Sequence, residues 1–345
     1  MLSYILKRLL LMIPTLLGAL TLTFVIIQFV PGGPIEQLIS EMRAESGGEG
    51  TAKVNARRDI DDKQMAELKA LYGFDKPPLE RYLSMLKSFA TFDLGKSFFR
   101  NKDVWQLIKE KLPVSISLGL WTFLISYLLS IPLGIAKAMR EGSRFDTLTT
   151  LLVLIGYAIP GFVLGVLLIV LFAGGTFLDW FPLRGLVSDN WAELSWPARI
   201  RDYLWHLTMP LICFAIGSLA VVTMLTKNTF VEEIRKQYVL VARAKGLSER
   251  RVLYKHVFRN ALIPIVTGFP AAFVGAFFAG SLLIETLFSL DGLGLLSYES
   301  LIRRDYAVVL GTLYFFTLIG LVVKLIGDLL YIVVDRRVQF GAVAK

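Results

Sequence analysis

The stretch Thr226–Ala261, which reads TKNTFVEEIRKQYVLVARAKGLSERRVLYKHVFRNA, lies between two long apolar runs and decides how the chain is organised. It contains nine Lys or Arg residues against three Glu. Its pattern predicts one helix from about Val231 to Lys245, a cap at Gly246, and a second helix that starts at Ser248. We therefore expect a structured loop outside the lipid, which is typical of a segment that binds another molecule.

The second predicted helix is amphipathic. Arg251, Lys255 and Arg259 are spaced to share one face, and the opposite face is expected to hold Leu253, Tyr254, Val257 and Phe258. In the first helix the small residues Ala242, Ala244 and Gly246 are expected to let the backbone of a partner approach closely. The alternative is a basic amphipathic loop that lies on anionic headgroups.

The composition places the chain in a membrane. It has 345 residues, of which 55% are hydrophobic and 19% are charged, with a mean hydropathy of +0.60. Soluble domains have a charged fraction of about 25%, and a membrane-spanning helix needs about 20 apolar residues. The sequence therefore predicts an all-α integral membrane protein with six transmembrane helices, at Leu9–Val30, Ser115–Ala136, Leu148–Phe172, Leu207–Leu225, Leu262–Leu287 and Ala307–Val334.

Charge asymmetry predicts the orientation. We expect the first run to be a retained helix, because it is longer than a signal-peptide apolar region and Phe29–Pro34 offers no small-residue cleavage site. The outer loops Ala173–Trp205 and Phe288–Tyr306 are slightly acidic, so both termini are predicted to be cytoplasmic. This asymmetry also accounts for much of the net charge of +9, and no nucleic-acid partner is expected. The basic segments are Lys137–Arg144, Thr226–Ala261 and Asp335–Arg337.

The predicted domains follow from these spans. Residues 1–30 form an N-terminal transmembrane helix, residues 31–111 a periplasmic insertion, and residues 112–345 a core of five transmembrane helices with the loop 226–261. Within the insertion, Glu41–Asp62 is expected to be mobile. Short helices are expected at Asp62–Leu71, capped near Gly73, and at Leu79–Phe89.

Several motifs in order give the chain a family resemblance. Tyr238–Gly246, followed by His256-Val257 and Asn260-Ala261-Leu262, resembles the cytoplasmic coupling loop of ABC importer permeases, most closely those of the dipeptide and oligopeptide branch. The chain departs from the general importer pattern at Leu240-Val241, where Glu-Ala is usual, and at Phe258-Arg259, where Leu-Pro is usual; Gly33 replaces the branch's usual Asp, and Ala307 a usual Pro. The other matching motifs are Arg8–Leu10, Ile13–Gly18, Val30–Pro34, Asp93–Ser97, Ile159–Phe162, Phe288-Ser289, Gly292–Leu295 and Arg304–Tyr306.

The resemblance implies a fold, partners and a role. The fold is that of a type I (MetI-like) ABC importer permease in the bacterial inner membrane. The partners are a second homologous permease, two ATPase subunits that bind ATP and Mg²⁺, and a periplasmic peptide-binding protein. The substrates are oligopeptides, among them peptide antibiotics such as microcin C, and no cofactor is expected on this chain. The implied ATPase-coupling residues are Tyr238, Val239, Leu240, Val241, Ala242, Arg243, Ala244, Lys245, Gly246, Leu247, Ser248 and His256.

Charges and helix breakers inside the spans give further candidates, because charges are costly in lipid. Lys324 and Asp328 are four residues apart on one predicted helix, which favours a mutual ion pair. Glu285 is predicted either to face a translocation path or to lie against the outer loops. Pro160 and Pro270 are assigned to the same path.

The residues offer little support for catalysis. Gly95-Lys96-Ser97 resembles the end of a phosphate-binding loop, but Ala90 stands where that motif needs Gly. His206 and His256 are predicted at opposite membrane faces, and the single Cys213 is expected to be a small core residue. No catalytic residue or metal site is predicted. An ATP-independent secondary transporter or channel for small solutes remains the alternative, and a membrane scaffold is a weaker one.

Overall fold

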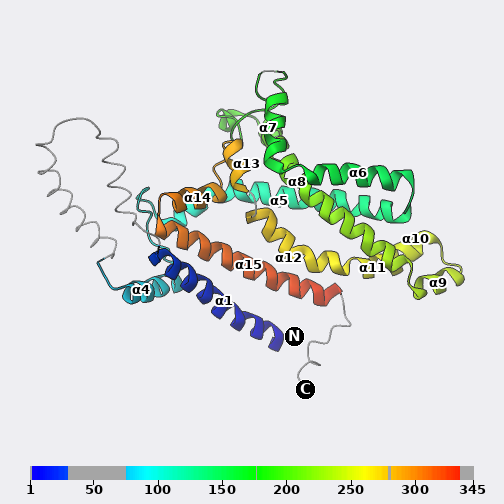
Figure 1. Ribbon diagram of the computed structural model, residues 1–345, viewed down its shortest axis with the longest axis horizontal. Helices are drawn as coiled ribbons and strands as arrows, with labels where there is room; N and C mark the ends of the chain where they lie inside the picture. The colour runs from blue at the N-terminus through cyan, green and yellow to red at the C-terminus, as the bar shows by residue number, and fades with distance from the viewer. Residues whose placement is uncertain (1, 30–74, 176, 279–280, 335–345) are drawn as a thin grey trace, which may run out of the picture. The chain divides into compact units, whose positions relative to one another are not determined.

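A computed structural model of the chain describes residues 2–29, 75–175, 177–278 and 281–334 (Figure 1). These residues are helical, apart from loops and one isolated antiparallel bridge between Lys96 and Asp103. The expected mobile stretch, the expected helix at Asp62–Leu71, Gly33 and Asp335–Arg337 lie outside the described residues.

Four helices are individually long and apolar enough to cross a membrane: α1 (Leu2–Phe29), α5 (Val104–Met139), α8 (Trp196–Ile234) and α15 (Tyr306–Val334). Two bent helix pairs also pass by composition, which gives up to six spans if each pair counts as one. They are α6 (Arg144–Ala158) with α7 (Gly161–Phe172), and Glu249–Ala261 with the start of α12 (Ile263–Phe278). Each of the six predicted spans overlaps one of these elements, and the fifth overlaps the second pair only in α12.

The third predicted span is sharply bent. Helices α6 and α7 meet at 93°, which is visible where α7 stands across α6 in Figure 1. Ile159 is extended there, with φ −85° and ψ 118°. Pro160 causes the break, because proline has no N–H and disfavours helical geometry in the residue before it. A Cβ on Gly161 would lie 2.6 Å from the carbonyl oxygen of Cys213, so the break brings this backbone against α8.

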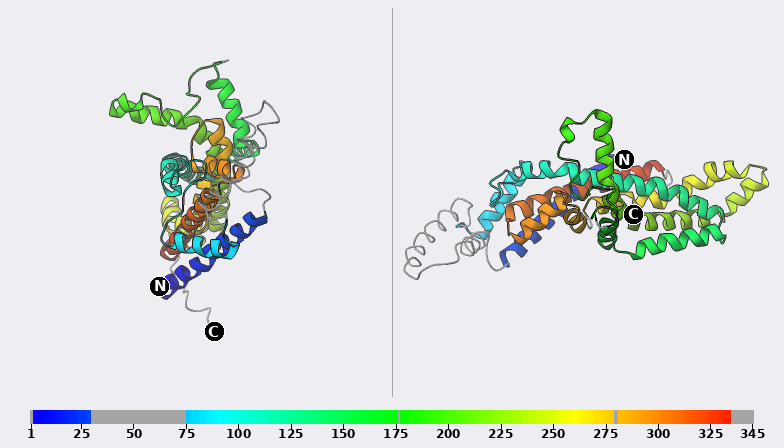
Figure 2. Two further views of the ribbon diagram at one scale, coloured as in Figure 1. Left: turned by 90° about the vertical axis from the view of Figure 1, so that its left-hand side faces the viewer. Right: turned by 90° about the horizontal axis from the view of Figure 1, so that it is seen from above.

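The fifth predicted span is divided between α12 and α13 (Ser281–Leu287). After α13 the chain enters α14 (Leu293–Ile302) and then α15. Helix α8 contains Pro210, and its first turns run at an angle to the rest of the helix (Figure 2). A proline inside a helix removes one backbone hydrogen bond and allows such a change of direction.

The chain divides into two compact units, which are described separately. Of the described residues, the large unit comprises 2–8, 112–175, 177–278, 281–295 and 319–334, and the small unit 9–29, 75–111 and 296–318. The part of α1 from Leu9 onward and residues 296–318 group with the small unit, and the division into N-terminal helix, insertion and core stays a prediction.

In the small unit, α4 (Pro78–Ala90) confirms the amphipathic helix predicted at Leu79–Phe89. Its Tyr82 packs against α1: the hydroxyl lies 2.5 Å from Oγ1 of Thr21, and the ring centroid lies 5.3 Å from that of Phe24. Aromatic contacts also join Phe89 to Tyr314, at 5.2 Å between centroids. Burial of these rings fixes α4 against two transmembrane segments.

Two of the family-like motifs meet in the small unit. Asp93–Ser97 forms a tight turn in which Gly95 has a φ of +77° and its N–H donates to Oδ1 of Asp93. At the end of this turn, the buried hydroxyl of Ser97 donates to Oδ2 of Asp305 at 2.5 Å. The N–H of Phe98 donates to the other oxygen of Asp305 at 3.3 Å. The segment that resembles the end of a phosphate-binding loop thus takes part in a structural hydrogen-bond network with Asp305.

The core of the large unit lies where α7, α8 and α13 pack together. Its centre includes Leu207, Leu211, Ile284 and Phe288, all almost fully buried. Cys213 is buried there too, which confirms the prediction that it is a small core residue.

Candidate coupling site

The polar loop between α8 and α12 contains α9 (Gln237–Ala244), α10 (Glu249–Arg251), a π-helix (Val252–Val257) and α11 (Phe258–Ala261). The single first helix predicted from Val231 to Lys245 is therefore wrong, because α8 continues to Ile234 and a new helix starts at Gln237. The break occurs where Lys236 adopts an extended conformation, with ψ 149°. Figure 1 shows α9 and α10 beyond one end of α8.

Gly246 ends α9 as predicted. Its φ is +77°, a conformation that glycine adopts without the cost that a Cβ adds. The N–H groups of Gly246 and Leu247 donate to the carbonyls of Arg243 and Ala242, at 2.9 and 3.4 Å. Ser248 has the extended backbone of an N-cap residue, but its side chain forms no cap hydrogen bond.

Across the Gly246 turn, Arg243 and Glu249 form a two-pronged ion pair. Nε of Arg243 lies 2.8 Å from Oε1 of Glu249, and Nη2 lies 3.0 Å from Oε2. Parallel hydrogen bonds of this kind fix the direction of both side chains. The pair therefore joins α9 to α10 across the turn.

One face of α9 is buried against the rest of the loop. Val239 is fully buried and Ala242 is 7% exposed, and both pack with Phe230 of α8, Val257 and Ala138 of α5. Ala242 is small because α5 and α8 lie close to it. Ala242 therefore packs inward against the helices of this chain and does not face outward toward a partner, contrary to the prediction.

A polar network holds the same side of the loop. The hydroxyl of Tyr238 donates to Oε1 of Glu233 at 2.7 Å and lies 3.3 Å from the carbonyl oxygen of His256. Nδ2 of Asn260 donates to the same hydroxyl at 3.2 Å, and Lys236 pairs with the buried Glu233. Tyr238 thus links α8, α9 and the second helix. His256 takes part in this network through its backbone carbonyl oxygen.

The opposite face of α9 is exposed and apolar at its centre. Leu240 is 57% exposed and Val241 53%, and Ala244, Lys245 and Gly246 are exposed beside them. Large apolar side chains on a short helix outside the membrane are typical of a contact surface. We name Leu240, Val241, Ala244 and Lys245 the outer face of α9. It includes Leu240 and Val241, the positions at which the chain departs from the general importer pattern.

A buried charge cluster that the sequence analysis missed lies at the base of the loop. Lys137 is fully buried; its Nζ lies 3.1 Å from Oδ1 of Asp146 and donates to Oγ1 of Thr149 and Thr150. Nζ of Lys227 lies 2.7 Å from the other oxygen of Asp146. Asp146 lies just beyond the basic segment 137–144, and that position was the available signal. The cluster ties α5, α6 and α8 together.

An exposed ion pair also joins the end of α8 to the turn between α5 and α6. Nη2 of Arg235, directly after α8, lies 2.8 Å from Oε2 of Glu141 in this turn.

The second helix of the loop differs from the prediction at Tyr254. Arg251, Lys255 and Arg259 are exposed as expected, and Val257 is buried as expected. Tyr254, however, is 58% exposed and lies with the cations. The π-helix explains the difference, because its i→i+5 hydrogen bonds change the angle between successive side chains from the α-helical value.

The candidate path residues have structural contacts. Glu285 is fully buried, and its Oε2 accepts a hydrogen bond of 2.7 Å from the N–H of Leu295 at the start of α14. A Cβ on Gly292 would lie 2.6 Å from this carboxylate, so Gly292 is needed for the close approach. Pro270 packs against Gly327 of α15, and Pro160 forms the α6–α7 bend. Glu285 is buried, Pro270 is partly buried and Pro160 is exposed, and their place on a translocation path stays a prediction.

Asp328, in the last span, pairs with a residue other than the predicted Lys324. Nε of Arg8 lies 3.1 Å from Oδ2 of Asp328. The predicted partner, Lys324, is exposed, and the described residues include no ion pair between Lys324 and Asp328. The prediction from residue spacing covered only neighbours on one helix, whereas the paired cation, Arg8, comes from α1.

Comparison with known proteins agrees with this architecture. Residues 130–340 match the family model described as binding-protein-dependent transport system inner membrane component. The chain is 53% identical to the peptidoglycan transport system permease protein YejB of Agrobacterium fabrum (strain C58), with 98% of each chain covered. It is 51% identical to the inner membrane ABC transporter permease protein YejB of Escherichia coli O157:H7, covering 98% of this chain and 99% of that one.

More distant relatives fit the same family. The oligopeptide transport system permease protein AppB of Bacillus subtilis (strain 168) is 33% identical, over 99% of this chain and 100% of that one. Within the branch, Gly33 and the string Lys255–Asn260 are the features by which the sequence most resembles YejB. The chain belongs to the binding-protein-dependent transport system inner membrane components and has the all-α, multi-pass fold of type I ABC importer permeases.

Proposed function

We propose that this chain is the permease subunit of an ATP-driven importer of oligopeptides, and that α9 couples it to a partner ATPase. The observation that carries the coupling role is the two-sided construction of α9. Val239 and Ala242 anchor it to α5 and α8, while Leu240 and Val241 are exposed. A helix held firmly on one side and apolar on the other suits insertion into a groove of another protein.

Family membership supports the proposed assembly. A second homologous permease completes the membrane part, two ATPase subunits bind ATP and Mg²⁺, and a periplasmic binding protein delivers the peptide. Both termini and the loop 226–261 face the cytoplasm, as the basic segments indicate. In this arrangement the chain has no catalytic residue of its own.

The loop is built to transmit force. The Arg243–Glu249 pair and the Tyr238 network join α9 to α10 and α8, and the Lys137–Asp146–Lys227 cluster joins α8 to α5 and α6. Closure of the ATPase dimer around ATP would displace α9, and these contacts would carry the displacement into α5, α6 and α8. A rigid connection of this kind alternates access to a central path.

The names of the relatives support a peptide substrate. AppB and YejB relatives are named for oligopeptide and peptidoglycan transport, so we propose oligopeptides, including peptidoglycan-derived peptides and peptide antibiotics such as microcin C. A strain that lacks this chain should take up less of a labelled oligopeptide and should resist microcin C. Unchanged uptake and unchanged sensitivity would contradict the substrate assignment.

The coupling role is tested with Gly246→Glu. The variant places a charged side chain at the end of α9 and strains a left-handed backbone position, at a cost of about 1–2 kcal/mol. We expect membrane insertion to be retained and ATP-driven uptake by the assembled importer to fall at least about tenfold. Gly142→Glu is the matched control, because Gly142 also has a positive φ, +75°, and open space around it, but lies in the α5–α6 turn.

A second arm separates the proposal from an ATP-independent transporter. Peptide uptake is measured after ATP is depleted while the proton gradient is maintained. We expect uptake to stop. Continued uptake, or normal uptake by Gly246→Glu, would contradict the proposal.

A further inference from the structure

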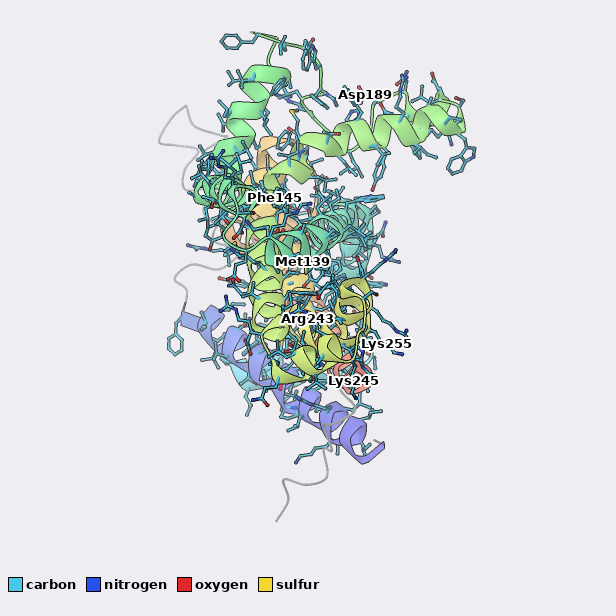
Figure 3. All side chains as sticks on the ribbon, turned by 90° about the vertical axis from the view of Figure 1, so that its right-hand side faces the viewer. Met139, Phe145, Asp189, Arg243, Lys245 and Lys255 are labelled. Carbon is cyan, nitrogen blue, oxygen red and sulfur yellow. The ribbon has the colours of Figure 1, made fainter. Side chains whose placement is uncertain are left out.

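The second helix of the coupling loop carries a basic hollow whose lining residues are not part of the outer face of α9. The hollow is shallow and open, has a volume of about 640 Å³, and is lined by Ser248, Arg250, Arg251, Tyr254 and Lys255. In Figure 3 the side chain of Lys255 projects outward from the loop.

The cations of this hollow lack local counter-charges, unlike many of their neighbours. Arg235 pairs with Glu141, Lys236 with Glu233, and Arg243 with Glu249. Within the described part of the chain, Arg250, Arg251 and Lys255 form no ion pair. Glu249, the acidic residue beside them in the sequence, is already held by Arg243. The hollow therefore presents three uncompensated positive charges to an external anion.

The position of the helix relative to the bilayer indicates which anion. Residues 249–261 lead into the apolar α12 at an angle of 48°. With α12 along the membrane normal and a rise of 1.5 Å per residue, Lys255 lies about 8 Å above Ile263, where α12 begins. The polar headgroup layer extends about 5–8 Å beyond the hydrocarbon core on each side. Lys255 therefore lies at the outer limit of the headgroup layer.

Tyr254 fits the same position. Its ring is 58% exposed beside the cations and lies 6.0 Å, between centroids, from the ring of Phe258. Tyrosine is enriched at the membrane–water interface, where its apolar ring contacts lipid and its hydroxyl contacts headgroups. Ser248 adds a further hydroxyl at the rim of the hollow.

We propose that this hollow binds the headgroup of an anionic phospholipid in the cytoplasmic leaflet. The two helices of the loop then have separate partners: the outer face of α9 contacts the ATPase through apolar side chains, and the basic hollow contacts lipid phosphate. The bound lipid keeps the second helix at the bilayer surface. When the ATPase displaces α9, the loop then rotates about this lipid-bound helix.

The test measures lipid retention by the full-length chain. The chain is reconstituted in phosphatidylcholine nanodiscs with or without phosphatidylglycerol, re-extracted in mild detergent, and analysed by native mass spectrometry for bound lipid. We expect phosphatidylglycerol, but not phosphatidylcholine, to remain bound. Arg251→Gln/Lys255→Gln should weaken phosphatidylglycerol binding roughly 30-fold, because each surface cation contributes about 1 kcal/mol, or about fivefold, to binding anionic lipid.

The matched control is Arg140→Gln/Arg144→Gln. It removes the same charge from two exposed positions outside the hollow, so phosphatidylglycerol binding should change by less than about threefold. Equal losses in both double variants would overturn the proposal in favour of non-specific attraction. Unchanged lipid retention in Arg251→Gln/Lys255→Gln, with loss of the ATPase during co-purification, would overturn it in favour of an acidic protein partner.

Discussion

The buried ammonium group of Lys137 lies 3.1 Å from Oδ1 of Asp146, and this carboxylate also holds Lys227 through its second oxygen at 2.7 Å. One side chain at the start of α6 therefore fixes the end of α5 and the last turns of α8. The coupling loop begins directly beyond these turns. The stability of the base of the loop thus depends on a single carboxylate.

Asp146→Asn should destabilise the chain strongly. It leaves the fully buried Lys137 without its counter-charge, and breaking a buried pair by removing one partner costs about 3–5 kcal/mol. The measurement is denaturant unfolding of the purified chain in detergent. Glu141→Gln is the control, since it breaks an exposed pair with Arg235 and should cost less than about 1 kcal/mol. Similar costs for the two variants would show that the cluster is not effectively buried.

Gly327→Ala should destabilise the packing of α12 on α15, whereas Gly320→Ala should not. A Cβ on Gly327 would overlap the ring of Pro270, while one on Gly320 would have no atom within 4 Å. Overpacking typically costs about 1–3 kcal/mol, and alanine in an unobstructed helix is favourable by about 0.5–1 kcal/mol. The thermal midpoints of the two variants in detergent should therefore shift in opposite directions. A shift of the same sign and size would exclude this close crossing.

The Arg8–Asp328 pair is tested by a double-mutant cycle. Arg8→Gln and Asp328→Asn should each reduce stability, and the double variant should be less affected than the sum, by about 1 kcal/mol. The same cycle with Lys324→Gln should give additive effects, because Lys324 is exposed and Asp328 pairs with α1. Coupling between Lys324 and Asp328 would restore the pair first expected from their spacing.

Ser97 and Asp305 should be strongly coupled. A hydrogen bond to a charged group contributes about 1.5–3 kcal/mol, and this one is buried at 2.5 Å. A cycle of Ser97→Ala and Asp305→Asn, followed by unfolding in denaturant, should give an interaction energy in that range. Arg100→Gln with Glu299→Gln is the comparison, since that pair is partly exposed and should give a smaller value. An additive result for Ser97 and Asp305 would contradict the network.

The membrane class, the six apolar runs and the cap at Gly246 could be predicted from the sequence, because each depends on local composition or on one residue's backbone freedom. Other features depend on contacts between distant segments. The inward turn of Ala242 follows from the proximity of α5 and α8, and the partner of Asp328 is supplied by α1. The exposure of Tyr254 follows from a π-helix that no local propensity indicates.

The contact between Ser97 and Asp305 also has a consequence for biosynthesis. These residues are separated by 208 positions, and Asp305 directly precedes α15. At a synthesis rate of about 5–20 residues per second, the turn at Asp93–Ser97 waits roughly 10–40 s for its acceptor to emerge. During that interval the hydroxyl of Ser97 has no Asp305 carboxylate to which it can donate. The small unit is therefore completed only after Asp305 has been synthesised, late in the chain.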